Sequence, residues 1–262
     1  MTNELNLKTC DEKNITVILT VWKRNHLRRQ LQTILQQTLS PAYIWVQQTQ
    51  KHVDVDDVVN EFQNSIKYSF YPENKGIFGR FESVGEVQTS YVFIMDDDII
   101  PGTEFLENAM RVSLKKNAIV SPAGRIIPPG SLHNGSNESR EYMRKYFIGD
   151  GLLYPYNYCY HDTCVSFGNN AWLLRTEWMK YFFSFEPYTR DSGEDIHLSA
   201  TCKILGGIDT FVPEQTTVEN CGNLKRSYSF DEIALHRQVG FCSLRSEIVL
   251  FFKQHGWLST EI

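Results

Sequence analysis

The chain has 262 residues and a formal net charge of −5, and 42% of its residues are hydrophobic while 22% are charged. This is the composition of an ordinary globular protein, long enough for one large domain, and it excludes a disordered, collagen-like or coiled-coil chain. The acidic charge gives no basic field for nucleic acid or an acidic membrane, and no stretch reaches the roughly 18 to 20 apolar residues of a membrane span.

The N-terminal residues and the cysteines both indicate a reducing compartment. Residues 1–13 are polar and lack the apolar core of a signal peptide, so we interpret them as an N-terminal extension. Six cysteines are scattered without a CxxC pair, which favours free thiols over a disulfide framework. We therefore expect a cytoplasmic protein without a transmembrane segment.

Apolar segments alternate with segments of helical spacing through the first hundred residues. The predicted strands are 15–21, 43–48, 66–71 and 91–95, and the predicted helices are 25–37, 56–65 and one through Phe81, Val84 and Val87. This alternation predicts an α/β fold with a mostly parallel central sheet and helices on both faces.

The second half of the chain is less regular. We expect a strand and a turn over 116–129, a polar loop over 131–140 and an aromatic, irregular segment over 151–166. The segments expected next are 169–175, 178–183, a helix over 192–205 and one long or two shorter helices over 230–257. No repeat or linker demands a second domain, so a single domain is predicted.

Three adjacent aspartates, Asp96, Asp97 and Asp98, follow the most hydrophobic predicted strand. Ligands of parallel α/β sheets bind beyond the carboxyl ends of the strands, and hard carboxylate oxygens suit Mg²⁺ or Mn²⁺. The sequence lacks the EF-hand, Walker and dinucleotide-binding glycine patterns. The triplet therefore predicts a metal–diphosphate site, and the alternative is a solvated acidic turn.

Other short motifs accompany the triplet in a definite order. They are Thr20-x-x-x-Arg24, Asn74-x-Gly76-x-x-x-Arg80, Gly193-Glu194-Asp195-Ile196 and His236-Arg237. Together they resemble GT-A fold glycosyltransferases, and most closely the exostosin-like transferase domain. The resemblance implies a Rossmann-like nucleotide-sugar fold in one continuous domain, with a nucleotide-sugar-binding half at 14–100 and an acceptor-binding half with C-terminal helices at 101–262.

The resemblance also implies roles for individual residues at the donor. The implied donor-binding residues are Thr20, Arg24 and Asn74 at the uridine and ribose, Arg80 at the diphosphate, and Asp96 and Asp97 beside the ribose and sugar. Asp98 is the implied ligand of Mn²⁺ or Mg²⁺. His236 completes the metal shell or is an ordinary surface or core histidine.

Glu194 and Asp195 are the predicted catalytic pair. An acceptor hydroxyl must lose its proton as it attacks the anomeric carbon, and an aspartate is a suitable general base, so Asp195 is the first candidate and Glu194 assists. The alternative is structural: Asp195 lies three residues after Ser192 and could close a capping box at the start of a helix. The exostosin-like relatives retain anomeric configuration with the help of a C-terminal arginine, but we cannot place that arginine securely, so we favour inversion slightly.

Aromatic and polar residues in the second half are candidates for contacts to the acceptor. Sugar rings pack against aromatic faces, but alternating tyrosines are also typical of one face of a strand. The predicted acceptor-binding residues are Tyr154, Tyr156, Asn169, Asn170 and Trp172. Lys225, Arg237 and Arg245 are candidates for a lid or for phosphate contacts, and a solvated charged loop is the alternative for Lys225.

The sequence thus predicts a metal-dependent glycosyltransferase that moves a sugar from a nucleotide-diphosphate donor to a glycan hydroxyl, and the resemblance implies a UDP-sugar as that donor. The competing interpretations are a retaining exostosin-like transferase, a nucleotidyltransferase and a carbohydrate-binding module without activity. A nucleotidyltransferase normally has a glycine-rich phosphate loop after its first strand, and residues 17–25 contain no glycine. The sugar remains open, with xylose among the candidates, and nucleic acid is not an expected partner.

Overall fold

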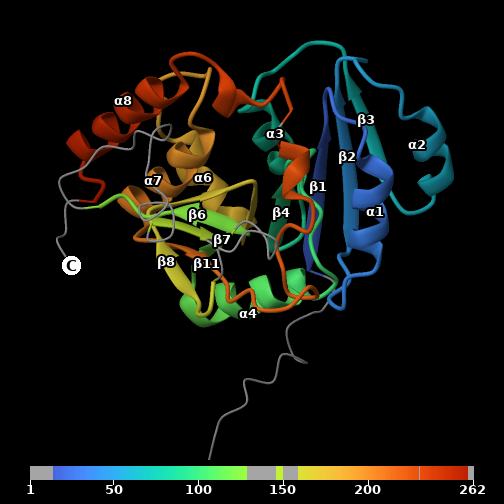
Figure 1. The fold of residues 1–262 in the computed structure, drawn as a ribbon, viewed down its shortest axis with the longest axis horizontal. Helices are drawn as coiled ribbons and strands as arrows, with labels where there is room; N and C mark the ends of the chain where they lie inside the picture. Colours follow the sequence, from blue (N-terminus) through green and yellow to red (C-terminus); the bar gives the residue numbers. More distant parts are fainter. Residues whose placement is uncertain (1–13, 129–145, 150–158, 230, 259–262) are drawn as a thin grey trace, which may run out of the picture.

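A computed structural model describes residues 14–128, 146–149, 159–229 and 231–258. The predicted N-terminal extension and the candidate residues Tyr154 and Tyr156 lie outside these ranges. The chain within them forms a central β-sheet enclosed by helices, with a smaller sheet beside it (Figure 1).

The central sheet has eight strands in the order β3-β2-β1-β4-β10-β5-β11-β8. Their bounds are β1 Ile15–Val21, β2 Tyr43–Thr49, β3 Lys67–Tyr71, β4 Tyr91–Met95, β5 Ile119–Val120, β8 Thr163–Val165, β10 Ala171–Arg175 and β11 Thr210–Val212. β1, β2, β3 and β4 pair in parallel, whereas β10 runs antiparallel between β4 and β5. One sheet therefore runs through both predicted halves of the chain.

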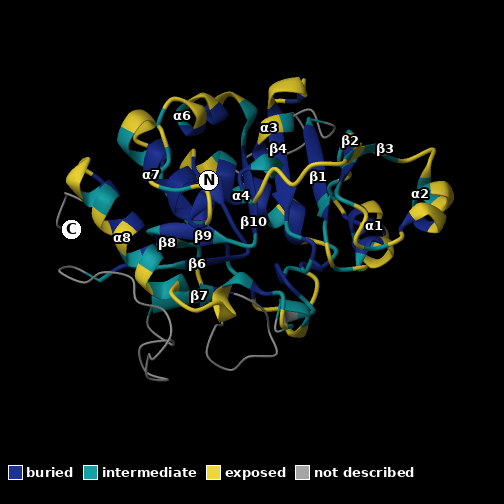
Figure 2. Ribbon diagram, turned by 90° about the horizontal axis from the view of Figure 1, so that it is seen from above, coloured by how far each residue is buried: buried dark blue, intermediate teal, exposed yellow. Residues whose placement is uncertain are grey.

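Helices cover both faces of this sheet. Their bounds are α1 Leu27–Leu35, α2 Asp56–Phe62, α3 Gly79–Glu82, α4 Phe105–Lys116, α6 Met179–Phe183, α7 Glu194–Gly206 and α8 Phe241–Gln254, with short 3₁₀ turns at Ser83–Glu86, Thr176–Trp178, Arg226–Ser229 and Leu235–Arg237. Strand side chains alternate between the faces: in β1, Val17 and Leu19 pack with α1 and α4, while Ile18 packs with α3, α6 and α7. The buried strands and the exposed outer helix faces are visible in Figure 2.

The smaller sheet joins the central sheet to the C-terminal helix. It consists of β7 Phe147–Gly149, β6 Ala123–Arg125 and β9 Phe167–Asn169, in that order. Phe167 of β9 shares a third apolar cluster with Ile196 of α7 and Phe252 of α8. This cluster fixes the position of α7, whose first turn carries the predicted catalytic pair.

The predicted strands and helices of residues 15–95 are all present, with ends shifted by a few residues. Helix α4 was not predicted. The expected strand over 116–129 is two short strands, β5 and β6, and the expected helical tail is wrong before residue 241: residues 231–240 contain a single 3₁₀ turn, and α8 begins after Gly240, which has a φ of 83°.

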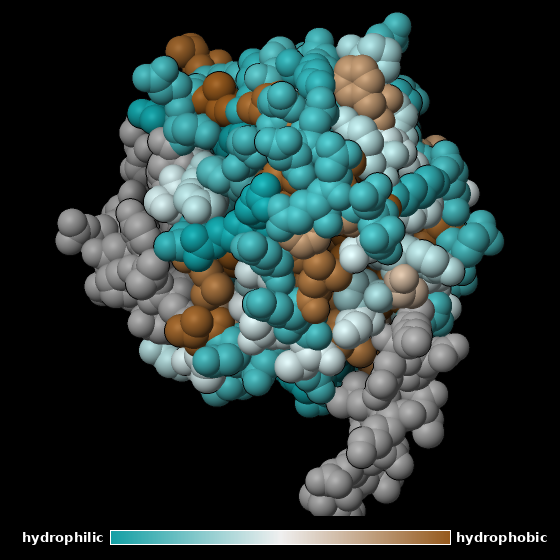
Figure 3. Space-filling model, turned by 90° about the vertical axis from the view of Figure 1, so that its right-hand side faces the viewer, coloured by the Kyte–Doolittle hydropathy of each residue, from teal (hydrophilic) through white to brown (hydrophobic). Residues whose placement is uncertain are grey.

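The face over α1, α2 and β3 is predominantly hydrophilic, with small separated apolar areas (Figure 3). No helix in the described part of the chain is long and apolar enough to cross a membrane. The five cysteines within the described ranges are free thiols.

Candidate active site

The site lies where the carboxyl ends of β1 and β4 meet the start of β10. Because β10 is antiparallel, the register that places Ala171 opposite Met95 brings Asn170 beside Asp96, whose N–H donates to the Asn170 carbonyl at 3.0 Å. Asn170 has a φ of 75°, a conformation that asparagine tolerates better than most residues. A polar segment before β10 is thereby brought against the aspartate triplet after β4.

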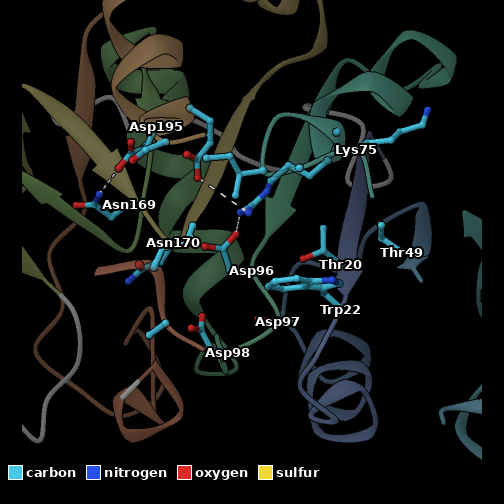
Figure 4. Close-up of a pocket in the computed structure, with 18 of the residues that line it drawn as sticks. Thr20, Trp22, Thr49, Lys75, Asp96, Asp97, Asp98, Asn169, Asn170 and Asp195 are labelled. Carbon is cyan, nitrogen blue, oxygen red and sulfur yellow. Dashed lines mark hydrogen bonds and ion pairs between the residues drawn. The ribbon is translucent and has the colours of Figure 1, made fainter. Parts of the chain in front are cut away.

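A cavity of about 1080 Å³ opens at this point. Figure 4 shows Thr20, Trp22, Thr49 and Lys75 on one side of it, Asn169, Asn170 and Asp195 on the other, and Asp96 between the two groups. The cavity is large enough for an extended ligand with several polar groups, and such clefts are the usual binding sites of enzymes.

Arg24 holds two of the three aspartates. Its Nη1 lies 2.7 Å from Asp97 and 3.2 Å from Asp98, while its Nε and Nη2 donate to Asp231 at 2.5 and 2.8 Å. Burial would lower the pKa of Arg24, but the hydrogen bond to Asp231 and the charges of Asp97 and Asp98 outweigh it, so the net pKa shift is upward. Arg24 therefore stays charged and neutralises part of the triplet.

Asp231 was not anticipated from the sequence. It lies 207 residues from Arg24 in a segment without regular structure, and no local pattern marks it as part of the site. Its bond to Arg24, together with the stacking of Tyr228 on His26 at 3.8 Å between ring centroids, holds the chain before α8 against the start of α1.

Arg80 connects the aspartate triplet to the predicted catalytic pair. Its Nη1 forms an ion pair with Asp96, and its Nη2 lies 4.0 Å from Glu194 (Figure 4). The guanidinium also lies over the ring of Trp172, 5.9 Å from the centroid. Arg80 lines the cavity, where its fork of donors suits phosphate oxygens.

Asp195 is enclosed by donors. Arg245 binds it in a bidentate ion pair, with 2.9 Å to Oδ1 and 2.7 Å to Oδ2, and Asn169 donates to Oδ2 at 2.6 Å. The side chains of Arg245 and Asp195 are only 5% and 7% exposed. Burial would lower the pKa of Arg245, but the charges of Asp195 and Glu194 raise it overall, so Arg245 stays charged.

Glu194 is the less constrained member of the pair. Its side chain is 12% exposed and lines the cavity, and its ion-pair contact among the described residues is the 4.0 Å approach of Arg80. Burial, followed by the neighbouring charge of Asp195, raises the pKa of Glu194 despite Arg80 and Arg245. The two adjacent carboxyl groups thus have different partners, because Asp195 is held by Arg245 and Asn169 while Glu194 is approached only at 4.0 Å by Arg80 within the described ranges.

The capping-box interpretation of Asp195 is wrong. Helix α7 begins at Glu194 after the N-cap Gly193, which has a φ of 82° and makes no side-chain cap. The hydroxyl of Ser192 has no hydrogen-bond partner in the described part of the chain. Gly193 is required here because a Cβ would meet Ile248 of α8 at 2.5 Å, in a backbone conformation that other residues rarely adopt.

The remaining donor candidates lie around the same cavity. Thr20 and Asn74 both line it; the Thr20 hydroxyl donates to Met95 O at 3.3 Å, and the Asn74 side chain accepts from the Gly76 N–H at 2.8 Å. Trp22 also lines the cavity, although the sequence gave no role to it. Asp98 and His236 line the cavity as well, His236 as an exposed side chain.

The acceptor and lid candidates are dispersed. Asn169 and Asn170 line the cavity, and Trp172 touches it with little surface, being 1% exposed and packed on Phe81 with its Nε1 donating to Gly168 O. Among the described residues that line the cavity, Lys225 and Arg237 do not appear, whereas Arg245 does. Arg245 therefore lines the cavity itself and is also bonded to Asp195.

Comparisons with known proteins identify the fold. No family model matches the chain, and no curated protein matches it. The crystal structure of S. aureus TarS 1–349 matches with a TM-score of 0.51 at 15% identity, over 78% of this chain and 59% of that chain. A second crystal structure of S. aureus TarS gives 0.48 at 14% identity, over 77% and 37%. The chain thus spans less than two thirds of either TarS chain.

The fold is of the GT-A type. This confirms the predicted α/β class with its mostly parallel sheet. At 15% identity the match with TarS concerns the fold alone. The exostosin-like resemblance stays a prediction, and so do the roles of the site residues.

Within the described ranges, no group of three or more His, Cys, Asp and Glu side chains is placed to hold a metal ion. Mg²⁺ is commonly held by one or two carboxylates together with phosphate oxygens and water, so a complete protein cage is not required. Asp98 and His236 both line the cavity and would supply an oxygen and a nitrogen ligand. The metal site at these two residues stays a prediction, and the Nη1 of Arg24 lies 3.2 Å from the Asp98 carboxylate.

The raised pKa of Glu194 makes Glu194→Gln a stabilising substitution at high pH. The folded state binds the proton more tightly than the unfolded chain, whose glutamate pKa is about 4.3, so ionised Glu194 destabilises the fold as pH rises through its folded pKa. We expect a higher melting temperature for Glu194→Gln at pH 8 and no difference below about pH 4. The exposed Glu177→Gln is the control; an equal gain there would refute the assignment.

Proposed function

We propose that the protein is a metal-dependent glycosyltransferase that moves a sugar from a nucleoside-diphosphate donor, a UDP-sugar, to a glycan hydroxyl. The observation that carries the proposal is a single cavity in a GT-A fold with the aspartate triplet on one side and the Glu194–Asp195 pair on the other, linked through Arg80. In this proposal, the metal and diphosphate bind beside the triplet, and the Glu194–Asp195 pair across the cavity receives the acceptor hydroxyl.

The donor's parts match the chemistry along the cavity. Thr20 and Asn74 offer hydrogen bonds to the uridine and ribose at the ends of β1 and β3, and Trp22 offers an aromatic face nearby. Arg24 faces three carboxylates, so in this proposal it orients Asp97 and Asp98, and its predicted contact with the ribose is not needed.

The departing diphosphate needs its developing charge stabilised. When bound at Asp98 and His236, Mn²⁺ or Mg²⁺ supplies positive charge to the phosphate oxygens. Arg80 adds a guanidinium on the same side of the cavity. Fixed donors aimed at developing charge lower the barrier in a site that largely excludes water.

The arrangement favours inversion. Retention in the exostosin-like pattern requires a C-terminal arginine at the substrate, but Arg245 is committed to Asp195 and Arg237 is exposed outside the cavity lining of the described residues. A carboxylate facing the acceptor side is what direct displacement needs, since the hydroxyl must lose a proton as it attacks.

Thermal unfolding with a panel of nucleotides tests this function. UDP with Mn²⁺ is expected to raise the melting temperature, because a ligand at 100 times its Kd stabilises the native state by about 2.7 kcal/mol, and UDP without metal is expected to give a smaller shift. Carbohydrate-binding modules would respond to glycans alone. If no nucleotide, with or without metal, shifted the melting temperature, the proposal would be disproved. In a separate measurement, the NMR signal of the anomeric proton in the product distinguishes inversion from retention.

A further inference from the structure

The first turn of α7 carries two carboxylates, Glu194 and Asp195, and one of them must accept the proton of the acceptor hydroxyl. The surroundings of the two side chains differ. Paired acidic groups whose environments separate their pKa values are the usual source of distinct roles in a catalytic site. The assignment of these roles deepens the proposed function and rests on it.

Asp195 has no lone pair left for an acceptor. An ionised carboxylate accepts about four hydrogen bonds. Oδ1 accepts from Arg245 at 2.9 Å and from the N–H of Ile196 at 2.8 Å, and Oδ2 accepts from Arg245 at 2.7 Å and from Asn169 at 2.6 Å. A carboxylate that gives up one of these bonds to take a proton would leave a buried arginine without its counter-charge.

The partner of Asp195 is itself fixed. The guanidinium of Arg245 lies between the rings of Phe167 and Phe241, 5.2 Å from each centroid. Arg245 comes from α8, which packs on α7 through the apolar cluster that contains Ile196 and Phe252. The ion pair therefore anchors the first turn of α7 to α8 and sets where the neighbouring Glu194 points.

Glu194 is less constrained than Asp195. Both residues line the cavity, but the ion-pair contact that the Glu194 side chain makes within the described ranges is long, at 4.0 Å to Arg80. The charges that face it are those of Asp195, Arg80 and Arg245, and burial together with Asp195 raises its pKa overall. A carboxylate of raised pKa is a stronger proton acceptor than an ordinary one.

We propose that Glu194 is the catalytic base of the transfer and that Asp195 and Arg245 are positioning residues. The acceptor oxygen forms a bond to the anomeric carbon as the bond from that carbon to the diphosphate oxygen breaks. The electron pair of the broken bond stays on the diphosphate, and the acceptor proton passes to a Glu194 oxygen. Glu194 later returns this proton to solvent, so the products are the glycoside and the nucleoside diphosphate.

Arg80 then has a part on both sides of the reaction. It pairs with Asp96 at the donor end of the cavity and approaches Glu194 at the acceptor end. Burial raises the pKa of Glu194, and the charge of Arg80 acts in the opposite direction. In this proposal, Arg80 both orients the base Glu194 and faces the diphosphate.

The test compares Glu194→Gln with Asp195→Asn/Arg245→Gln, a double variant that removes both charges of the buried pair. The substrates are UDP-glucose, UDP-galactose, UDP-N-acetylglucosamine and UDP-xylose with saturating Mn²⁺, and UDP release with water as acceptor is measured from pH 5 to 9. Glu194→Gln is expected to lose at least about a hundredfold in kcat with unchanged UDP binding. It should also lose the acidic limb of the wild-type pH profile.

The double variant is expected to keep that acidic limb, displaced to lower pH, because the lost Asp195 charge, which raises the Glu194 pKa, has a larger effect than the lost Arg245 charge, which lowers it. Turnover within tenfold of wild type in Glu194→Gln would overturn the assignment, whether or not the double variant folds. A double variant that binds UDP but has lost both turnover and the acidic limb would return the base to Asp195. A wild-type protein that binds no UDP contradicts the proposed function itself, which separates the two failures.

Discussion

Arg245→Met is expected to lower the free energy of unfolding by about 3–5 kcal/mol, because it leaves the charge of Asp195 buried without its partner. The pair is one of the most enclosed in the structure, at 5% and 7% side-chain exposure, and both guanidinium nitrogens that bind Asp195 lie within 2.9 Å of it. Urea unfolding measures the loss directly. A loss of this size would make it one of the most damaging single changes in the chain.

Two controls separate the buried charge from the volume change. Lys203→Met removes an ion pair between α7 and Asp209 at 42% and 45% exposure, and exposed pairs contribute at most about 1 kcal/mol. Arg245→Met/Asp195→Leu removes both charges and is expected to recover most of the stability, because replacing a buried pair by apolar side chains is often neutral. Equal losses in the Arg245 and Lys203 variants would show that Asp195 is not desolvated.

The sequence predicted the part of the site that follows from strand ends. Asp96, Asp97 and Asp98 come directly after β4, Thr20 lies at the end of β1 and Arg24 follows that strand, so the parallel pairing of β1 and β4 was enough to expect them together. The positions of these residues follow from short-range patterns. A buried apolar run predicts the strand, and the end of that run predicts that the next residues lie at the edge of the sheet. The same reasoning predicted the helices on both faces of the sheet.

The contacts that give these residues their roles were not predictable in this way. The Asp195–Arg245 pair spans 50 residues and the Arg24–Asp231 pair 207, and no local periodicity joins residues so far apart. The antiparallel insertion of β10 beside β4 also depends on tertiary pairing, and it decides that Asn169 and Asn170 face the aspartates. The hydrogen bonds of Arg245 and Asn169 to Asp195 then distinguish it from Glu194, which a sequence cannot show for adjacent residues.

Helix α4 was missed although its pattern is present in the sequence. Leu106, Met110 and Ser113 recur at helical spacing and are buried, and two lysines end the helix before Asn117, which has a φ of 50°. Polar residues between them weakened the apolar signal. The buried face packs on β10 and β5. The helix is therefore stabilised by burying its apolar side chains against the sheet, a tertiary contact that local periodicity does not show.

Asp98→Asn is expected to remove the metal-dependent part of UDP binding. An amide is a weaker ligand than a carboxylate for a hard divalent cation, and the proposed site draws on Asp98 and His236, with the remaining ligands coming from phosphate and water. The melting temperature with UDP and Mn²⁺ should fall to the value with UDP alone, while the ligand-free protein melts near the wild type. Titrations of Mn²⁺ at fixed UDP give the change in apparent affinity.

Asp231→Asn is the matched control, because it removes a different carboxylate partner of Arg24 and leaves the triplet intact. Arg24 in that variant still pairs with Asp97 at 2.7 Å and Asp98 at 3.2 Å, so the metal-dependent shift should persist. If Asp98→Asn kept the full metal-dependent shift, Asp98 would be a partner of Arg24 and nothing more. If both variants lost the metal-dependent shift, Arg24 would be the residue on which the shift depends, because both substitutions remove a carboxylate partner of its guanidinium.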